Sequence, residues 1–303
     1  MSRHPSPSEN TAMENFSLET ETPQSAEGLG LPTTTCSLPL VVAYGGGLNS
    51  TAMLCGFRER GIVPALILFA DTGGEMPETY VHTLKMKVIA SEWWPETSFG
   101  VVKKLHNGEF EGLEKECIRG KKLPALAYGS KACSMKYKIQ PQTKRLKEWM
   151  DKNGIKSVQR AIGYDAKESH RATHIEYEDL KKGRSATNWF PLIEWQWRRE
   201  ECAEAINRHN LPIPGKSACF FCPAMKRGEI IRLKSKHPHL FDRAVAMEKA
   251  ANGEDGSNKQ VRGLTGRSFM WSDIVADDEA QGKLWEYLDE NDESPTPCGC
   301  YDG

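Results

Sequence analysis

The stretch that decides the fold is Leu40–Thr51, which reads LVVAYGGGLNST. Its apolar start predicts a buried strand. The glycines at 45–47 let the backbone turn sharply and come close to a ligand. The polar residues after them are expected to cap a helix that runs to Arg60, and the candidates are Asn49, Ser50 and Thr51. A strand, a glycine turn and a helix N-terminus together predict a site for a phosphate or pyrophosphate.

The glycine turn does not match the two best-known phosphate-binding patterns. No Gly-Lys-Ser/Thr follows the glycines, so the turn is not a Walker A loop. The third glycine comes too early for the dinucleotide-binding fingerprint. Taken alone, the run fits a tight turn in an ordinary α/β domain equally well.

A second apolar run favours the nucleotide-binding interpretation. Residues 62–70 are almost entirely apolar and lead directly into Asp71, Thr72 and Gly73. An acidic residue at the carboxyl end of the second strand can reach a ribose or an adenine edge in an open parallel sheet. The alternative role for Asp71 is to cap the turn that follows.

Strand and helix patterns alternate along the rest of the chain. We expect strands near residues 38–43, 63–70, 99–103 and 157–162, and helices near residues 50–60, 77–91, 140–152 and 198–209. This alternation is typical of βαβ units that build a parallel sheet. The polar tract 177–187 is expected to form a loop over the site.

Composition divides the chain into three parts. Residues 1–37 are rich in Ser, Thr, Pro and Glu and poor in large apolar residues, which predicts a disordered tail. Residues 38–213 are predicted to form the nucleotide-binding domain. Residues 214–303 are predicted to form a helical C-terminal extension that carries a CxxC and a CxC pattern.

Charge and hydropathy exclude some classes of protein. The chain has 303 residues, a formal net charge of −1 and a pI of about 6.7, so no global field attracts it to nucleic acid or membrane. Only a local basic patch could do so. No apolar run is long enough to span a bilayer, and the N-terminus lacks the apolar region of a signal peptide. These features predict a cytoplasmic protein with no membrane partner.

The nine cysteines include two close pairs, Cys219/Cys222 and Cys298/Cys300. In a chain of this length in a reducing compartment, such cysteines are more often metal ligands, nucleophiles or core residues than disulfides. Four thiolates suit an iron–sulfur cluster or a structural zinc. They would come from Cys133, Cys219, Cys222 and either Cys298 or Cys300. The alternative is a set of scattered buried thiols.

Two further segments carry side chains that can bind anions. Lys136 and Lys138 follow Cys133 just before a predicted helix, which makes them candidates for holding a phosphate or sulfate. The loop after residues 157–162 contains the second set, Gly163, Glu168, Ser169 and Arg171. Arginine binds anions in a fork geometry, and Glu168 can hold Arg171 in place or bind the nucleotide. The alternative for both segments is an ordinary solvated surface.

In this order and spacing, the motifs resemble those of the phosphoadenosine phosphosulfate (PAPS) reductase family in the PP-loop, or adenine nucleotide alpha hydrolase-like, superfamily. The matching pieces are Tyr44–Ser50, Asp71–Gly73, Cys133–Pro141, Gly163–Arg171, Pro191–Trp195 and Cys219–Pro223. The resemblance implies an α/β fold with an open, mostly parallel five-stranded sheet, helices on both faces, and an adenine nucleotide across the carboxyl edge of the strands.

The resemblance also implies roles by position. The phosphates would lie on Gly45, Gly46, Gly47, Asn49 and Ser50. Asp71 would lie near the ribose or adenine, and the terminal anion would face Lys136, Lys138 and Arg171. The other nucleotide-binding candidates are Tyr44, Thr72, Gly73, Gly163, Glu168 and Ser169. The implied nucleotide is ATP with Mg²⁺, or a sulfonucleotide. The metal candidates are Cys133, Cys219, Cys222 and Cys300, for a 4Fe-4S cluster or Zn²⁺.

The chain departs from the family pattern at three places. Gly45 and Asn49 replace the Ser and Asp of the Ser-Gly-Gly-x-Asp-Ser loop that ATP-hydrolysing members carry. Ala132 stands where cluster-bearing reductases have the first cysteine of a Cys-Cys pair. Cys298-Gly299 echoes the reductases' closing Glu-Cys-Gly-x-His motif without its Glu and His.

Three functions fit these motifs. The first is ATP-dependent adenylation followed by sulfur transfer onto a nucleic acid or a small molecule, with a thiol or sulfur-donor protein as a further partner. The second is a sulfonucleotide reductase in which Cys298 attacks the sulfate sulfur. The third is a non-enzymatic nucleotide-binding subunit with structural zinc.

Overall fold

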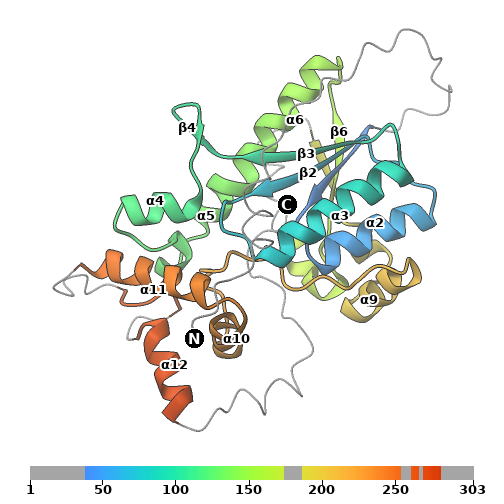
Figure 1. Ribbon diagram of the computed structural model, residues 1–303. Coiled ribbons are helices and arrows are strands. Elements are labelled where there is room, and N and C mark those ends of the chain that lie inside the picture. Colours follow the sequence, from blue (N-terminus) through green and yellow to red (C-terminus); the bar gives the residue numbers. More distant parts are fainter. Residues whose placement is uncertain (1–37, 174–185, 254–260, 266–268, 281–303) are drawn as a thin grey trace.

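A computed structural model describes residues 38–173, 186–253, 261–265 and 269–280. Its centre is a five-stranded sheet in the order β3-β2-β1-β6-β7 (Figure 1). The strands are β1 (Leu40–Tyr44), β2 (Leu66–Asp71), β3 (Ser98–Lys103), β6 (Val158–Ile162) and β7 (Ala186–Trp189). All neighbouring pairs are parallel, so every strand ends at the same edge.

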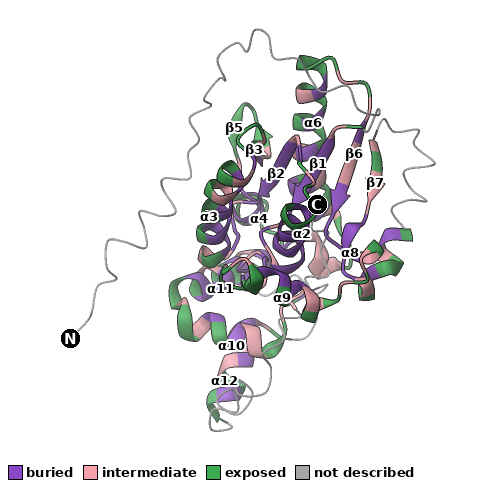
Figure 2. Cartoon of the chain, turned by 90° about the vertical axis from the view of Figure 1, so that its right-hand side faces the viewer, coloured by how far each residue is buried: buried purple, intermediate pink, exposed green. Residues whose placement is uncertain are grey.

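Every residue of β1 and β2 is buried, because helices cover both faces of the sheet (Figure 2). One face packs against α2 (Leu48–Glu59), α3 (Pro77–Trp93) and α9 (Arg199–Arg208). The other face packs against α6 (Gln140–Lys152). Each face of the sheet has its own hydrophobic core, and alternate strand residues point into one or the other. Val42 and Ile67 lie in the core with α2, α3 and α9, and Val41 and Leu68 lie in the core with α6.

A separate hydrophobic core joins the later helices to the middle of the chain. It contains residues of α10 (Arg227–Lys236), α11 (Pro238–Asn252), α12 (Trp271–Ala280) and α4 (Leu113–Arg119). Phe220 and Phe221, next to Cys219, are buried in this core. The C-terminal helices therefore pack on α4, and the CxxC segment (Cys219–Cys222) packs against the same core.

Short elements complete the carboxyl-edge side of the sheet. The β4–β5 hairpin (Leu105–His106 and Glu109–Phe110) projects beyond β3 (Figure 1). A 3₁₀ turn η1 (Ala125–Tyr128) and the short α5 (Ala132–Ser134) lead to a π-helical turn, η2 (Met135–Ile139), which continues into α6. A 3₁₀ turn, η3 (Ala166–Glu168), follows β6, and α8 (Pro191–Glu194) follows β7.

The predicted α/β class and parallel sheet are confirmed, and two local predictions are wrong. The first helix begins at Leu48 with Gly47 at its N-cap and no side-chain cap, so Asn49, Ser50 and Thr51 lie inside the helix. Strand β7 begins inside the tract expected to be a loop, because Ala186 to Trp189 pair with β6. Residues 174–185 of that tract and the predicted tail 1–37 lie outside the described residues.

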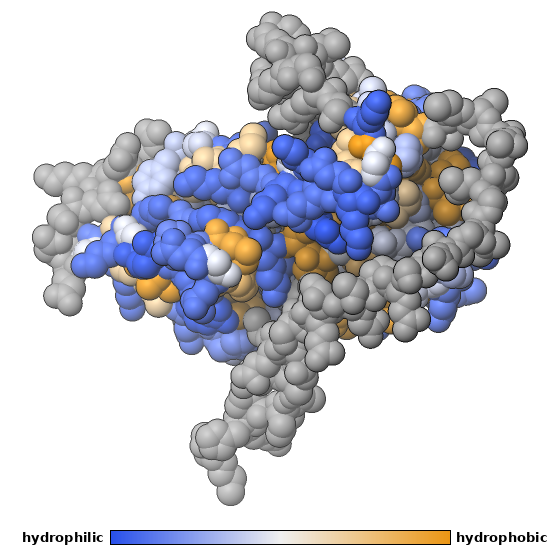
Figure 3. All heavy atoms as spheres, turned by 90° about the horizontal axis from the view of Figure 1, so that it is seen from above, coloured by the Kyte–Doolittle hydropathy of each residue, from blue (hydrophilic) through white to orange (hydrophobic). Residues whose placement is uncertain are grey.

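Within the described ranges, none of the helices combines the length and apolar character needed to cross a membrane. Figure 3 shows the molecule of Figure 1 from above. Hydrophilic residues cover most of this surface, and apolar residues form separate areas between them.

Candidate functional site

The glycine loop lies between β1 and α2 at the carboxyl edge of the sheet. Gly46 has a φ of +76°, and a Cβ there would lie 3.0 Å from Thr83 Oγ1 and 3.1 Å from Thr79 Cγ2. Only glycine adopts this conformation without strain at so close an approach to α3. Since no side chain caps α2, its first backbone N–H groups stay available at the positive end of the helix dipole. This geometry suits an anion.

Two other contacts tighten the loop. A Cβ at Gly47 would lie 2.7 Å from Oγ of Ser217, a buried residue just before the CxxC segment. A Cβ at Gly163 would lie 3.1 Å from both Cα and N of Ser50, so the end of β6 presses directly on the first turn of α2. Ser50 itself donates a hydrogen bond to the Gly47 carbonyl, 3.2 Å away. Sequence reasoning missed Ser217, because the neighbouring cysteines carried the only recognisable pattern.

A buried polar chain supports the loop from below. Tyr44 OH lies 3.1 Å from Thr51 Oγ1, which in turn lies 2.9 Å from His82 Nε2. Burial lowers the pKa of His82 to about 4, so the ring is neutral near pH 7. Tyr44 is fully buried, and burial raises the pKa of its phenol above the usual value. The structure thus places Tyr44 beneath the nucleotide candidates, as a support.

Asn49 connects the glycine loop to the loop after β6. Its Nδ2 donates to Asp165 Oδ2 at 3.2 Å and to Glu168 Oε2 at 3.1 Å. Arg171 pairs with Glu168 and lies over the Tyr164 ring, 4.2 Å from its centroid. An aspartate at 49 would bring a third carboxylate to this cluster, which gives a physical reason for the amide.

Sequence reasoning did not single out Asp165, although its spacing to Glu168 is that of a capping box. Asp165 Oδ1 accepts a hydrogen bond from the Lys167 backbone N–H, 2.9 Å away. Asn49 Oδ1 is buried and has no hydrogen-bond partner among the described residues. Ser169 is exposed, and its carbonyl accepts from Thr173 Oγ1. The structure therefore brings Gly163 and Glu168 to the glycine loop and leaves Ser169 at the surface.

Asp71 caps the turn after β2. Its Oδ1 accepts hydrogen bonds from the Gly73 N–H at 2.8 Å and from the Tyr80 OH at 2.7 Å, and its Oδ2 lies 3.4 Å from Lys103 Nζ. Asp71 is buried, and its hydrogen bond to the Gly73 N–H is the turn-capping contact that the sequence offered as the alternative. Contact between Asp71 and a ribose or adenine stays a prediction.

Three of the predicted metal ligands line one small cavity at the same edge. Cys133, Cys219 and Cys222 share it with Thr72 and Lys138, and its volume is about 30 Å³. That is room for one or two water molecules. The rest of the lining is mainly apolar: Leu113, Pro124, Ala218, Phe221 and Pro223, together with Ser134. Ser134 Oγ is buried and has no hydrogen-bond partner in the described part of the chain.

Polar groups from the loop after β2 and from η2 reach the cavity. Thr72 Oγ1 donates to Glu75 Oε1 at 3.1 Å and lies 3.2 Å from Cys219 Sγ. Lys138 Nζ lies 3.5 Å from Glu75 Oε1, which is almost completely buried. Glu75 was absent from the sequence-based candidates.

The CxxC segment is held by backbone pairing to the loop after β2. Cys219 forms an isolated antiparallel bridge with Glu75, and Phe220 N–H donates to the Gly74 carbonyl at 2.8 Å. A Cβ at Gly74 would lie 2.4 Å from Cε1 of Phe221, so only glycine fits there. Thr72, which follows β2 directly, and Cys219 are therefore fixed relative to each other.

The other cysteines behave differently. Cys55, Cys117 and Cys202 are buried in the cores, and burial raises the pKa of Cys55 and of Cys117 to about 12. No disulfide involves the described cysteines. Within the described ranges, no group of three or more His, Cys, Asp or Glu side chains is arranged to hold a metal ion. Cys298 and Cys300 lie outside the described residues.

Lys136 and Lys138, two residues apart, point to different places. Lys138 is buried beside Glu75, whereas Lys136 is exposed and its Nζ lies 3.9 Å from Glu116 Oε1 on α4. Arg171 follows the turn after β6 and is paired with Glu168. The structure thus keeps these three candidates for the terminal anion in three separate ion-pair clusters.

No model of a known protein family matches the chain. An uncharacterized protein of Methanocaldococcus jannaschii is 26% identical over 214 residues, covering 68% of this chain and 40% of that protein, so the chain matches about two-fifths of its relative's length. Among solved structures, the tRNA thiolase NcsA from Methanococcus maripaludis, with its 4Fe-4S cluster, matches at 13% identity and a TM-score of 0.40. That match covers 89% of this chain and 79% of the thiolase.

Proposed function

We propose that the chain is an enzyme of the PP-loop type that uses an adenine nucleotide to activate an acceptor for sulfur transfer. The observation that carries this proposal is the shared edge: Cys133, Cys219 and Cys222 line a cavity that also contains Thr72, at the carboxyl ends of the strands where the glycine loop lies. Ser217, two residues before Cys219, packs on Gly47 and so links the two sites.

The residue types at the cavity match a thiophilic metal group, although the described cysteines are not arranged to hold one. Three cysteine side chains in a largely apolar cavity suit an iron–sulfur cluster or zinc, whose closed sites take four thiolates. The unpartnered Ser134 hydroxyl is consistent with a site that holds a further group. The 30 Å³ cavity must widen to admit a cluster. Cys300 remains the proposed fourth ligand, and a bound cluster would supply a place to hold the transferable sulfur.

The residues of the chain support a two-stage reaction. First, an acceptor oxygen attacks the α-phosphorus of ATP, and the bond to pyrophosphate breaks. The backbone N–H groups of the glycine loop and of the α2 N-terminus stabilise the negative charge of the departing pyrophosphate. A Mg²⁺ ion bound with ATP would neutralise part of the same charge. Sulfur then displaces AMP from the acceptor, taking the place of the activated oxygen. Lys138 and Cys219 line the same cavity, where the ammonium lies beside Glu75.

The test is anaerobic purification followed by metal analysis, a visible absorption spectrum and an ATP assay. We expect a brown protein with broad absorbance near about 400 nm, as thiolate-bound iron–sulfur clusters show, and release of AMP and pyrophosphate when acceptor is present. A colourless protein with one zinc and no AMP release would contradict sulfur transfer and favour a nucleotide-binding subunit. Reduction of a sulfonucleotide without ATP would favour the reductase.

A further inference from the structure

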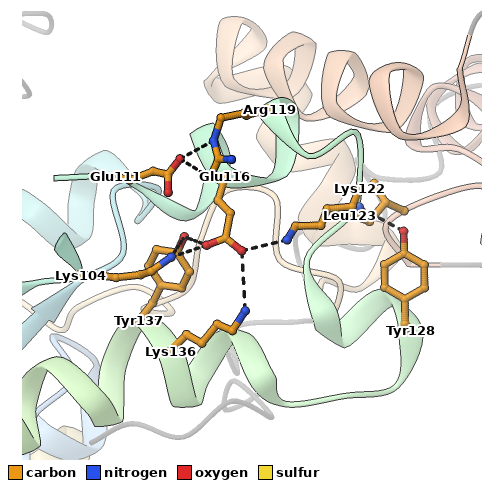
Figure 4. A network of polar contacts seen from close by, with 9 residues as sticks. All are labelled: Lys104, Glu111, Glu116, Arg119, Lys122, Leu123, Tyr128, Lys136 and Tyr137. Carbon is orange, nitrogen blue, oxygen red and sulfur yellow. Dashed lines mark hydrogen bonds and ion pairs between the residues drawn. The ribbon is translucent and has the colours of Figure 1, made fainter. Parts of the chain in front are cut away.

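Glu116, on α4, is surrounded by cationic side chains (Figure 4). Lys122 Nζ lies 3.0 Å from Oε1, Lys136 Nζ lies 3.9 Å from the same oxygen, and Lys104 Nζ contacts Oε2. The Tyr137 OH also donates to Oε2, at 2.6 Å. Burial acts to raise the pKa of Glu116, but these hydrogen bonds hold it well below the usual range, so the carboxylate is ionised at neutral pH.

This cluster carries an excess of positive charge. With the neighbouring Arg119–Glu111 pair, four cationic side chains face two carboxylates. The Lys122 and Lys136 side chains are 47% and 52% exposed, so both keep part of their ammonium groups in solvent. Because the whole chain has a net charge of −1, the excess is a local property of this surface. We call it the lysine face, defined by Lys104, Lys122 and Lys136 around Glu116.

The arrangement favours a polyanion over a single phosphate. Glu116 occupies the centre of the three ammonium groups, where a lone phosphate or sulfate would otherwise bind. Each ammonium has three N–H donors, so donors not used by Glu116 can point outward. Successive phosphates of a nucleic acid backbone can meet separate lysines and release counterions from each contact.

The lysine face adjoins the cysteine cavity. Leu113, one helical turn before Glu116 on α4, lines the cavity. Lys136 lies between Ser134 and Lys138, which both line it. A backbone bound on this face would therefore run beside the thiols.

The β4–β5 hairpin offers a surface for unpaired bases next to the lysine face. Leu105 is 55% exposed and Phe110 is 37% exposed. Lys103 Nζ lies 4.6 Å from the Phe110 ring centroid, and a Cβ at Gly73 would lie 2.8 Å from Phe110 Cζ, so the ring lies over the loop after β2. Exposed aromatic rings beside lysines are typical of sites where unpaired bases stack.

We propose that the lysine face and the β4–β5 hairpin bind an RNA that carries unpaired nucleotides, and that they present it to the cysteine cavity. Folded RNA offers both a dense phosphodiester backbone and splayed loop bases, whereas duplex DNA keeps its bases stacked and paired. This inference rests on the proposed function, because it names the class of the acceptor.

The test measures fluorescence anisotropy of a labelled RNA stem–loop, without ATP, on the full-length protein as purified. Lys122→Glu with Lys136→Glu is expected to weaken binding at least about tenfold and to lower the salt slope by about two, because two phosphate contacts are lost. The matched control is Lys152→Glu with Lys156→Glu: both lysines are exposed near the start of β6, at the opposite edge of the sheet, and the pair changes the net charge equally. The control is expected to bind like the wild type.

Two further measurements guard against misfolding and test the hairpin. Lys122→Gln with Lys136→Gln removes the charges without adding a repulsive pair, and it should still weaken binding while the thermal unfolding midpoint is retained. Phe110→Ala should weaken stem–loop binding about five- to tenfold and leave binding of a fully paired RNA duplex unchanged.

Three results would overturn the proposal: equal loss of binding in the control, duplex DNA bound as tightly as the stem–loop, or no binding of any nucleic acid. The last would point to an acidic protein as the occupant. Since the assay contains no ATP, Gly46→Asp should retain RNA binding. RNA binding without AMP release would count against the proposed function and leave this inference intact.

Discussion

The glycine loop and the cysteine cavity lie at the same sheet edge, but they are built in opposite ways. The loop is tightly packed: Gly46 and Gly47 leave no room for a side chain, and Tyr44, Thr51 and His82 form a hydrogen-bonded support beneath it. The cavity retains empty volume and the unpartnered Ser134 hydroxyl. A rigid loop suits a ligand recognised by backbone N–H groups, whereas an incompletely filled cavity suits a group that arrives after folding.

The largest effect should come from breaking the rigid loop. Gly46→Asp places a carboxylate where the phosphates are expected and forces a left-handed conformation on a non-glycine residue. We expect nucleotide affinity to fall by at least about a hundredfold, equivalent to about 2.7 kcal/mol, with the fold retained in far-UV circular dichroism. Equilibrium binding of a fluorescent ATP analogue measures this. A well-folded variant with unchanged affinity would refute the phosphate-site assignment.

The second prediction tests the cysteine cavity by replacing one thiol at a time. Cys219→Ser and Cys222→Ser should each abolish or strongly reduce bound metal, because an alcohol is a poor ligand for a thiophilic ion. Their nucleotide affinity should stay within about twofold of wild type, since the glycine loop is untouched. Metal analysis after anaerobic purification gives the first value. Cys55→Ser, in the core, is the control, and an unchanged metal content in the Cys219 and Cys222 variants would contradict the ligand assignment.

The third prediction concerns the helices that pack on the cavity side. Glu248, on α11, is fully buried and accepts the Leu264 N–H at 2.8 Å and the Trp271 N–H at 3.0 Å. Burial raises its pKa from 4.5 to about 7, although these hydrogen bonds oppose the shift. The native state therefore holds more protons than the unfolded state between these values, and stability should fall as the pH rises from about 4.5 to 7.

Glu248→Gln should flatten this contribution to the pH dependence. Urea unfolding at several pH values measures it, and the expected change is on the order of 2–3 kcal/mol across the window. The pH dependence of nucleotide binding should not change, because Glu248 contacts Leu264 and Trp271 in the core of the C-terminal helices. A variant with the wild-type slope would show that other groups dominate.

The smallest effect should come from the contact between the two sites. Ser217→Ala removes only the hydroxyl that packs on Gly47. We expect a two- to fivefold weaker affinity for ATP, the size of one net hydrogen bond of about 0.5–1 kcal/mol, and unchanged metal content. Isothermal titration with ATP measures it. Lower metal content with unchanged affinity for ATP would show that Ser217 supports the cysteine cavity and not the glycine loop.

Much of the fold followed from local patterns. The helix at 140–152 was predicted with its observed bounds, because Pro141 marks its first turn. Four strands were predicted to within a few residues of their observed bounds, because each is an apolar run. Strand β7 was missed, since ATNW is short and half-exposed and forms only by pairing with β6. The missing cap at α2 also has a tertiary cause, because Asn49 is held by Asp165 and Glu168.

The cysteine part of the site could be predicted from the sequence, because the CxxC spacing marks it. Cys133, Cys219 and Cys222 were grouped from the sequence, and the structure brings them to one cavity. Glu75, Glu116 and Ser217 were not found, because each also makes contacts with residues remote in the chain: Glu75 with Lys138 and Cys219, Glu116 with Lys136 and Tyr137, and Ser217 with Gly47. Lys136 and Lys138 point in different directions because side chains two residues apart lie on different faces of a helical turn.

The bridge between Glu75 and Cys219 has a consequence for biosynthesis. The ribosome releases the glycine loop and most of its supporting strands long before Cys219 emerges, and contacts between remote residues form slowly. The cavity can close only after the C-terminal helices have folded onto α4, because Phe220 and Phe221 belong to their core. We therefore expect the nascent chain to form a nucleotide site first and to receive metal only after α10, α11 and α12 have folded onto α4.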